Sequence, residues 1–333
     1  MDLPVNLLMF AVGLILLITG AILGATVQSE AEHFAFLSYT VQLGDLAVEP
    51  IRIDTPNPLP PTTDFVNVLS NVVPMVRSKP DAVPEVFIAP KTLVYNTNNL
   101  RIYQNTPVRF ITNLYTTYLN IIVRADDDTV QPINTLQDAL NQSLRLKVVY
   151  TDDTLLPIAE LMFPRKNVRG YEQYTYTDFL RQKELAKGVI YFLWTHEQDP
   201  YLKTLGTRTK LRIVDVDQEV PGILAKYPSL QRKGYDVQTQ GATNKRPLVT
   251  TYADKVAIWG FDSLPKNARN NQRIYQFTRT LFQHIEYIRR NVLPEYRNLF
   301  LELRPDTMVE IPLVPYHEGV ARYFHEMGAY SYS

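Results

Sequence analysis

The chain has 333 residues, with 34 basic and 34 acidic side chains and a formal net charge of zero. This balance argues against a nucleic-acid-binding surface, which needs a clustered excess of Lys and Arg. The absence of Cys excludes disulfides, zinc–thiolate sites and thiol nucleophiles. No HExxH motif, phosphate-binding Gly loop or Ser/His/Asp motif context is present, so we expect no metal site, no cofactor and no enzymatic activity.

The first apolar run, residues 7–27, contains no charged residue, and no Lys or Arg precedes it. A helix of this length spans about 30 Å, the hydrocarbon thickness of a bilayer. We therefore predict one transmembrane anchor within residues 1–30. Gly13, Gly20 and Gly24 share one side of that helix, at a spacing that lets a second membrane helix approach closely. They predict packing against integral membrane partner proteins, although Gly is also common in membrane helices generally.

The region after the anchor is rich in proline. Residues 50–61 are expected to be extended, because proline fits neither a helix interior nor a central strand. Thr63 or Asp64 is expected to cap a short helix that Pro74 ends. Short strands are predicted at residues 36–48, 86–89 and 93–95.

From residue 108 onward, predicted strands and helices alternate. Strands are predicted where apolar and β-branched residues form runs of strand length, at residues 108–114, 119–124, 146–150, 189–194 and 211–216. One helix begins at Thr135, and a second follows the capping residues 151–154. A third is capped by Thr177 or Asp178 and ended by Gly188. This alternation predicts an α/β lobe with a largely parallel sheet, and we expect the acidic run 126–128 to be a solvated turn.

The last third of the chain predicts two more strands and two helices. The strands are expected at residues 248–252 and 256–259. A long amphipathic helix from Ile274 to Ile288 should end before Pro294, and a short helix should cover residues 318–327.

Taken together, several segments resemble the TAXI-type solute-binding proteins of TRAP-type uptake systems. The colinear segments are VRFITNLYTTYLNIIVRADDDTVQPINTLQDA, LLPIAELMFPRKNVRGYEQYTYTDFLRQKELAKGVIYFLWTHEQDPYLKTL, LRIVDVDQEVPGILAKYPSL, LVTTYADKVAIWGFDSLPKN and HEGVARYFHEMGAYS. The last segment is similar to the family's terminal motif and is the most specific of the five. The resemblance implies a two-lobed, type-2 periplasmic-binding-protein fold after the transmembrane helix, with a ligand cleft between lobes that closes by hinge motion.

The resemblance also implies domain boundaries and a location. The first part of lobe 1 would cover residues 31–117, lobe 2 residues 118–216, and the return to lobe 1 with the C-terminal helices residues 217–333. The body would lie on the extracytoplasmic, periplasmic side of the membrane. The chain departs from the family at its glycine- and serine-rich ligand loop, because residues 36–61 offer only Gly44 and are rich in proline.

Candidate ligand-binding residues lie where this arrangement would place the cleft. Tyr115, Thr117 and Tyr118 fall near the predicted lobe crossing, and their rings and hydroxyls suit either a small carboxylate or amino acid, or ordinary packing. Thr151 and Thr154 flank two aspartates where a strand feeds a helix N-terminus. Such a terminus attracts anions, but aspartates repel them, so these residues favour a capping role. A third group, at the end of a predicted strand, suits the cleft edge or a structural role: Trp194, Thr195 and His196.

Two functions remain open on these observations. The first is a membrane-anchored solute-binding protein that takes a small organic acid or amino acid for a transporter. The second is a ligand-free binding-protein fold reused as a structural subunit of a membrane complex, which the missing glycine loop and the Gly-faced anchor favour. The discriminating feature is the cleft, which is either open and polar or filled by side chains from residues 50–61.

Overall fold

The computed structural model describes residues 50–55, 58–77, 84–95, 107–261, 268–301, 303 and 314–328. The predicted anchor with Gly13, Gly20 and Gly24, and the strand predicted at residues 36–48, lie outside these ranges. Within them, no helix is both long enough and apolar enough to cross a bilayer. The chain divides into two units, Met1–Pro50 and Ile51–Ser333, and the fold described below is that of the second.

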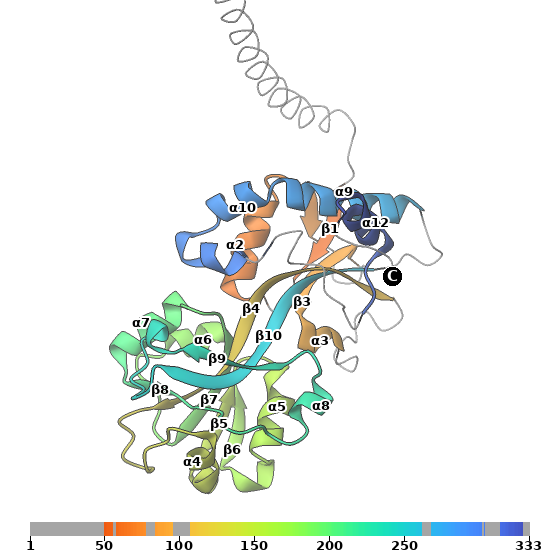
Figure 1. Cartoon of the computed structure of the whole chain (residues 1–333). Coiled ribbons are helices and arrows are strands. Elements are labelled where there is room, and N and C mark those ends of the chain that lie inside the picture. The colour runs from red at the N-terminus through yellow and green to blue at the C-terminus, as the bar shows by residue number, and fades with distance from the viewer. Residues whose placement is uncertain are drawn as a thin grey trace, which may run out of the picture. The chain divides into compact units, whose positions relative to one another are not determined.

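The second unit is a mixed α/β structure built on one sheet (Figure 1). The strands described are β1 (Ile51–Asp54), β2 (Met75–Arg77), β3 (Val86–Pro90), β4 (Val108–Arg124), β5 (Lys147–Tyr150), β6 (Gly170–Gln173), β7 (Val189–Thr195), β8 (Leu211–Ile213), β9 (Gln231–Asp236) and β10 (Leu248–Phe261). The α-helices described are α2 (Pro60–Leu69), α3 (Lys91–Tyr95), α4 (Leu136–Asn141), α5 (Leu155–Met162), α6 (Tyr176–Arg181), α7 (Pro200–Arg208), α8 (Ile223–Lys226), α9 (Ala268–Gln283), α10 (Ile285–Asn291) and α12 (Glu318–Glu326). Short 3₁₀ helices are η3 (Ser143–Arg145), η4 (Arg165–Asn167), η5 (Gln238–Gln240) and η6 (Pro294–Phe300).

The strand order is β2-β1-β3-β10-β4-β7-β5-β6, with β8 paired to β4 and β9 paired to β10. Strands β4 and β10 are long and antiparallel to each other, and each extends through both parts of the sheet (Figure 1). We call the part built on β1–β3, residues 108–115 and residues 256–261 the first half. The part built on β5–β9, residues 118–124 and residues 248–253 is the second half. Four residues join them, Thr116 and Thr117 of β4 with Asp254 and Lys255 of β10, and we call these the neck.

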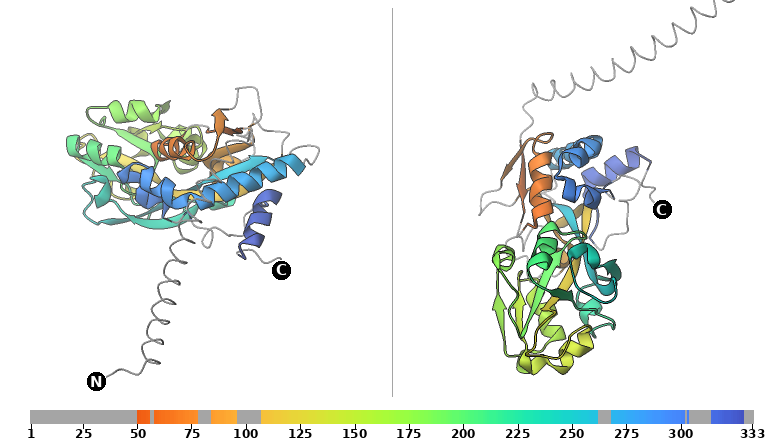
Figure 2. Two further views of the ribbon diagram at one scale, coloured as in Figure 1. Left: turned by 90° about the horizontal axis from the view of Figure 1, so that it is seen from above. Right: turned by 90° about the vertical axis from the view of Figure 1, so that its left-hand side faces the viewer.

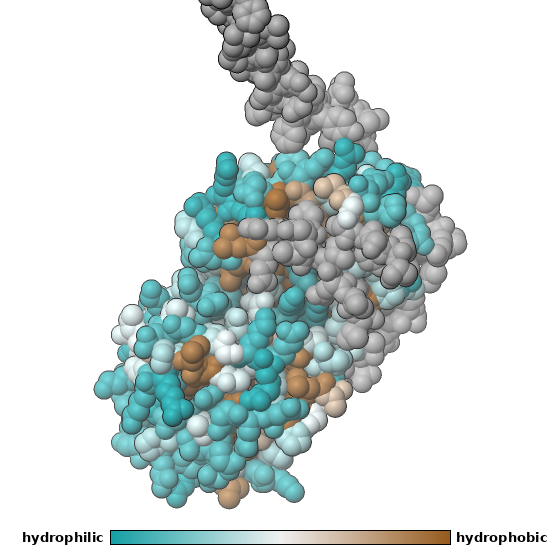
Figure 3. Space-filling model, in the orientation of Figure 1, coloured by the Kyte–Doolittle hydropathy of each residue, from teal (hydrophilic) through white to brown (hydrophobic). Residues whose placement is uncertain are grey.

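Each half has its own hydrophobic core. In the first half, side chains of β1, β3, α2, α9, α10, η6 and α12 form one cluster with the fully buried Trp259. Figure 2 shows α2, α9 and α10 lying together beside the strands of this half. In the second half, one cluster joins α4, α5 and α8 to one face of the sheet, and another joins α6 and α7 to the opposite face. The face drawn in Figure 3 is mostly hydrophilic, with separate small hydrophobic patches, as expected when the cores close internally.

Burial on both faces explains the continuous apolar runs in the sequence. Along β7, Ile190, Phe192 and Trp194 face one core, while Tyr191 and Leu193 face the other. A strand covered on both faces has no polar side to alternate with, so the whole run is apolar. The predicted strand at residues 189–194 is confirmed for this reason.

The prediction of a largely parallel sheet is wrong. Strand β5 is parallel to β6 and β7, but β4 is antiparallel to β7, β8 and β10. The four strands predicted at residues 108–114, 119–124, 248–252 and 256–259 are two continuous strands, β4 and β10. The polar residues of the neck interrupt the apolar pattern without interrupting the backbone ladder, which joins Thr117 to Asp254.

Several helices differ from the predictions. Helix α2 begins at Pro60, because proline is well suited to the first turn of a helix, where its missing N–H is not needed. Residues 91–95 form a helix instead of the strand predicted at residues 93–95. Helix α6 is capped by Thr175 and ends at Arg181, short of Gly188. The long amphipathic helix is divided into α9 and α10 around His284.

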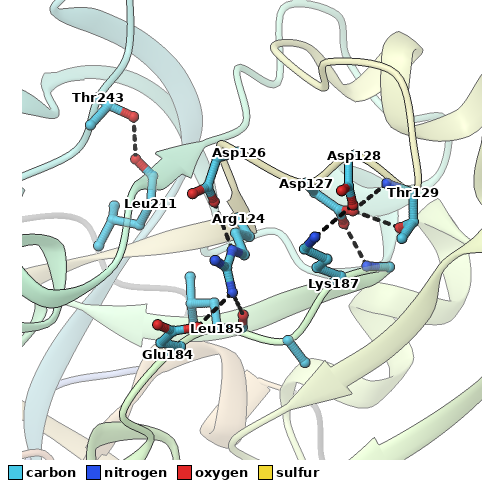
Figure 4. A network of polar contacts seen from close by, with 12 residues as sticks. Arg124, Asp126, Asp127, Asp128, Thr129, Glu184, Leu185, Lys187, Leu211 and Thr243 are labelled. Atoms are coloured by element: carbon cyan, nitrogen blue, oxygen red, sulfur yellow. Dashed lines mark hydrogen bonds and ion pairs between the residues drawn. The ribbon is translucent and has the colours of Figure 1, made fainter.

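The acidic run at residues 126–128 does more than face solvent (Figure 4). Its three carboxylates accept, in chain order, from the Arg124 guanidinium at 2.6 Å, from the Gly188 N–H at 2.5 Å and from the Lys187 ammonium at 2.6 Å. The contacts with Gly188 and Lys187 fix the turn after β4 to the segment that leads into β7.

Candidate functional site

A cavity of about 550 Å³ lies where the two halves of the sheet meet. Its lining comes from both halves and from the neck: Pro58, Leu59, Pro90, Thr117, Thr151, Asp152, Asp153, Gln173, Tyr174, Thr175, Tyr176, Asp178 and Trp194. This volume lies within the range of about 300–1,000 Å³ that small-molecule sites occupy. Pro58 and Leu59 form part of the wall, and the side chains of the described residues leave this space unfilled.

One wall is the loop from β5 to α5. Thr151 continues the β5 ladder, because its N–H donates to the Phe192 carbonyl oxygen at 3.1 Å. Asp152 then folds back on the loop, and its Oδ1 accepts from the Thr154 N–H at 2.7 Å. The loop is therefore fixed by its own side chains. Burial raises the pKa of the Asp152 carboxyl.

The adjoining wall is the turn from β6 to α6. Because β6 lies parallel to β5, the C-terminal ends of both strands reach the same edge of the sheet. Thr175 caps α6: its hydroxyl accepts from the Asp178 N–H at 3.0 Å and donates to Asp178 Oδ2 at 2.7 Å. That hydroxyl lowers the pKa of Asp178. The Gln173 amide donates to Asp153 Oδ1 at 2.9 Å and ties the two walls together.

Tyr176 connects the cavity to a buried polar group behind it. Its hydroxyl donates to Asp199 Oδ2 at 2.7 Å. Asp199 is 1% exposed, and its other oxygen caps α7 by accepting from the Tyr201 and Leu202 N–H groups at 2.9 and 3.0 Å. Burial, with the nearby Asp199 carboxylate, raises the pKa of Tyr176 well above its usual value.

Three of the residues predicted from the sequence line the cavity, namely Thr117, Thr151 and Trp194. Thr117 belongs to the neck and donates its hydroxyl to the Asp254 carbonyl oxygen at 3.3 Å. The Trp194 indole N–H donates to the Thr154 hydroxyl at 3.2 Å, so the Thr154 side chain holds the tryptophan ring and does not itself line the cavity. Whether these residues bind a ligand stays a prediction.

The other predicted residues lie away from the lining. Tyr115 and Thr62 share a hydrogen bond of 2.7 Å between their hydroxyl groups inside the first half. Tyr118 stacks on Tyr235, with ring centroids 4.7 Å apart. The Thr195 hydroxyl accepts from the Asn120 amide.

His196 is also buried behind the cavity. Its Nε2 lies 3.5 Å from Asp199 Oδ2, and its ring meets that of Tyr296 edge-on, with centroids 5.4 Å apart. Since Tyr296 belongs to the core of the first half, this contact is a second link between the halves besides the neck.

Much of the lining was not singled out from the sequence as a binding surface. Asp152 and Asp153 were expected to act only as caps, and Asp178 was expected to begin a helix. Residues 173–176 also line the cavity, and rings and hydroxyls alternate in this segment. Only the parallel pairing of β5 with β6 places this segment beside the β5–α5 loop. No group of His, Asp and Glu with the arrangement of a metal site occurs in the described ranges.

Comparison of the sequence with protein-family models and with curated proteins gives no match. Among solved structures, the chain is similar to periplasmic solute-binding proteins. One is the substrate-binding protein of an amino acid ABC transporter (15% identity, 75% of this chain and 98% of that chain covered, TM-score 0.38). Others are the periplasmic binding protein BugD (9%, 75% and 86%, TM-score 0.43) and a TctC solute-binding protein from Polaromonas (12%, 84% and 98%, TM-score 0.39).

Proposed function

We propose that the chain is a solute-binding protein that holds a small polar molecule in the cavity beside the neck. The observation that carries this proposal is the cavity itself, which is walled by both halves of the sheet and lined by carboxylate, hydroxyl and amide groups beside aromatic and apolar side chains. Two halves joined by a narrow neck can close around a ligand, as hinged binding proteins do. The resemblance to TAXI-type proteins in the sequence adds a membrane-tethered, extracytoplasmic location, a membrane transporter as partner, and a small carboxylate or amino acid as solute.

The proposal is tested by ligand-induced stabilisation of the full chain in mild detergent. The thermal unfolding midpoint would be measured with a panel of amino acids, organic acids and organic amines. A ligand at 100 times its dissociation constant adds about 2.7 kcal/mol, which raises the midpoint of a chain of this size by roughly 5 °C.

A cavity-filling variant locates the binding. Gln173→Trp places a bulky ring at an exposed lining position of an edge strand and should abolish the stabilisation. Gln231→Trp makes the same change at an exposed position of β9 outside the lining and should leave it intact. If no compound stabilises the wild-type chain, the result favours the alternative function, a ligand-free structural subunit of a membrane complex.

A further inference from the structure

The charge of the cavity lining is strongly one-sided. Asp152, Asp153 and Asp178 all line it, whereas the described lining includes no Lys, Arg or His. The hydrogen bonds described above bring these carboxylates only neutral donors, namely a backbone N–H, an amide and a hydroxyl. Among the described residues none of the three forms an ion pair. A ligand carboxylate would therefore meet like charge, and a cation would meet opposite charge.

The start of α2 beside the cavity lacks the donors that bind anions. Leu59 is the N-cap of this helix and lines the cavity. The next two residues, Pro60 and Pro61, have no N–H. The N–H groups of Thr62 and Thr63 both donate to the Leu59 carbonyl oxygen, at 2.9 and 3.2 Å. A helix N-terminus usually offers free N–H groups to an anion, but none of the first four positions of α2 does so.

Aromatic rings complete the walls. Tyr174, Tyr176 and Trp194 line the cavity, and the last two are held by hydrogen bonds to buried partners, Asp199 and Thr154. The faces of such rings attract ammonium groups, and the attraction increases as the cation loses water. Rings fixed in place lose little freedom when a ligand binds.

We propose that the cavity recognises a small organic cation, through an ammonium group placed among the three aspartates and the aromatic rings. This inference rests on the proposed function, since it names the class of solute that the same cavity takes. It narrows the expectation from the sequence: a solute that carries only carboxylates is excluded, and one that carries an ammonium group is favoured.

The test compares probes of similar shape and different charge by isothermal titration calorimetry on the full chain. The cations are choline and 1,4-diaminobutane, the neutral counterpart of choline is 3,3-dimethylbutan-1-ol, and the anion is succinate. We expect at least one cation to bind, no binding of succinate, and affinity for choline at least about tenfold above that of its neutral counterpart if choline is the cation that binds.

Charge-removing variants tie the binding to the cavity. Asp153→Asn and Asp178→Asn keep an oxygen acceptor for their neighbours and should each weaken cation binding about threefold to tenfold. Asp217→Asn removes the same charge from an exposed position outside the lining and should change nothing.

The outcomes separate the inference from the proposed function. If succinate binds and the cations do not, the cavity is a solute site but the inferred class is wrong. Equal affinity for choline and its neutral counterpart, or unchanged cation binding in both cavity variants, also overturns the inference. If no probe or panel compound binds, both the inference and the proposed function fail.

Discussion

Removal of the Asp199 carboxylate tests whether the buried hydrogen bond from Tyr176 to Asp199 stabilises the wall of the cavity. In Asp199→Ala, the first turn of α7 loses its side-chain cap, and the Tyr176 hydroxyl loses its buried acceptor. Loss of a cap costs about 1–2 kcal/mol. A buried hydroxyl left without a partner costs about 1–3 kcal/mol. We therefore expect the free energy of unfolding to fall by about 2–5 kcal/mol.

The assay is urea denaturation followed by tryptophan fluorescence, with two comparison variants. Thr135→Ala removes the capping box of α4, which involves no buried tyrosine, and should cost only about 1 kcal/mol. Asp199→Asn keeps oxygen and shape and should cost less than Asp199→Ala. If Asp199→Ala and Thr135→Ala cost the same within error, the bond from Tyr176 to Asp199 contributes nothing, and the reasoning is refuted.

Two further predictions concern helix packing and pH. A Cβ on Gly319 would overlap the Asn271 carbonyl oxygen in the backbone of α9, so Gly319→Ala should destabilise the chain by about 1–3 kcal/mol in urea. Gly234→Ala, whose Cβ would meet no atom closer than 3.7 Å, is the matched control and should be close to neutral. Burial raises the pKa of Asp254, so the folded chain binds more protons there than the unfolded chain, and stability should fall as pH rises through that pKa. Urea denaturation at a series of pH values should show a shallower fall in Asp254→Asn, and identical slopes would contradict this assignment.

The sequence predicted those elements whose signals are local. The helix predicted to begin at Thr135 forms, and the Thr135 hydroxyl caps it by accepting from the Asp138 N–H at 3.2 Å. The run at residues 189–194 forms a strand because every side chain in it is apolar or aromatic. Helix α7 was missed, although Asp199 followed by Pro200 is a usual start of a helix and was present in the sequence.

The elements that depend on contacts with distant parts of the chain could not be predicted from local sequence signals. The neck residues Thr116 and Thr117 look like a break between two strands, and only their pairing with β10 keeps the strand continuous. The candidate site also depends on pairing between distant segments. Residues 151–153 and 173–178 lie together because β5 pairs with β6. No local pattern at either segment states that they share a cavity. The predicted residues that do line the cavity were chosen for three different reasons: Trp194 ends a predicted strand, Thr151 follows one, and Thr117 lies at the predicted lobe crossing.

The neck has a mechanical consequence. Strand β7 pairs with β4 only from the residue after Thr117 onward, and β9 and β3 stop short of Asp254 and Lys255. At this level the ladder is a ribbon of two strands, the kind of β-structure that twists most strongly. Torsion of the ribbon would therefore change the separation of the cavity walls elastically and without breaking ladder hydrogen bonds. Thr117 belongs to this two-stranded ribbon and also lines the cavity. A molecule that contacts Thr117 would therefore contact the segment whose twist sets the separation of the walls.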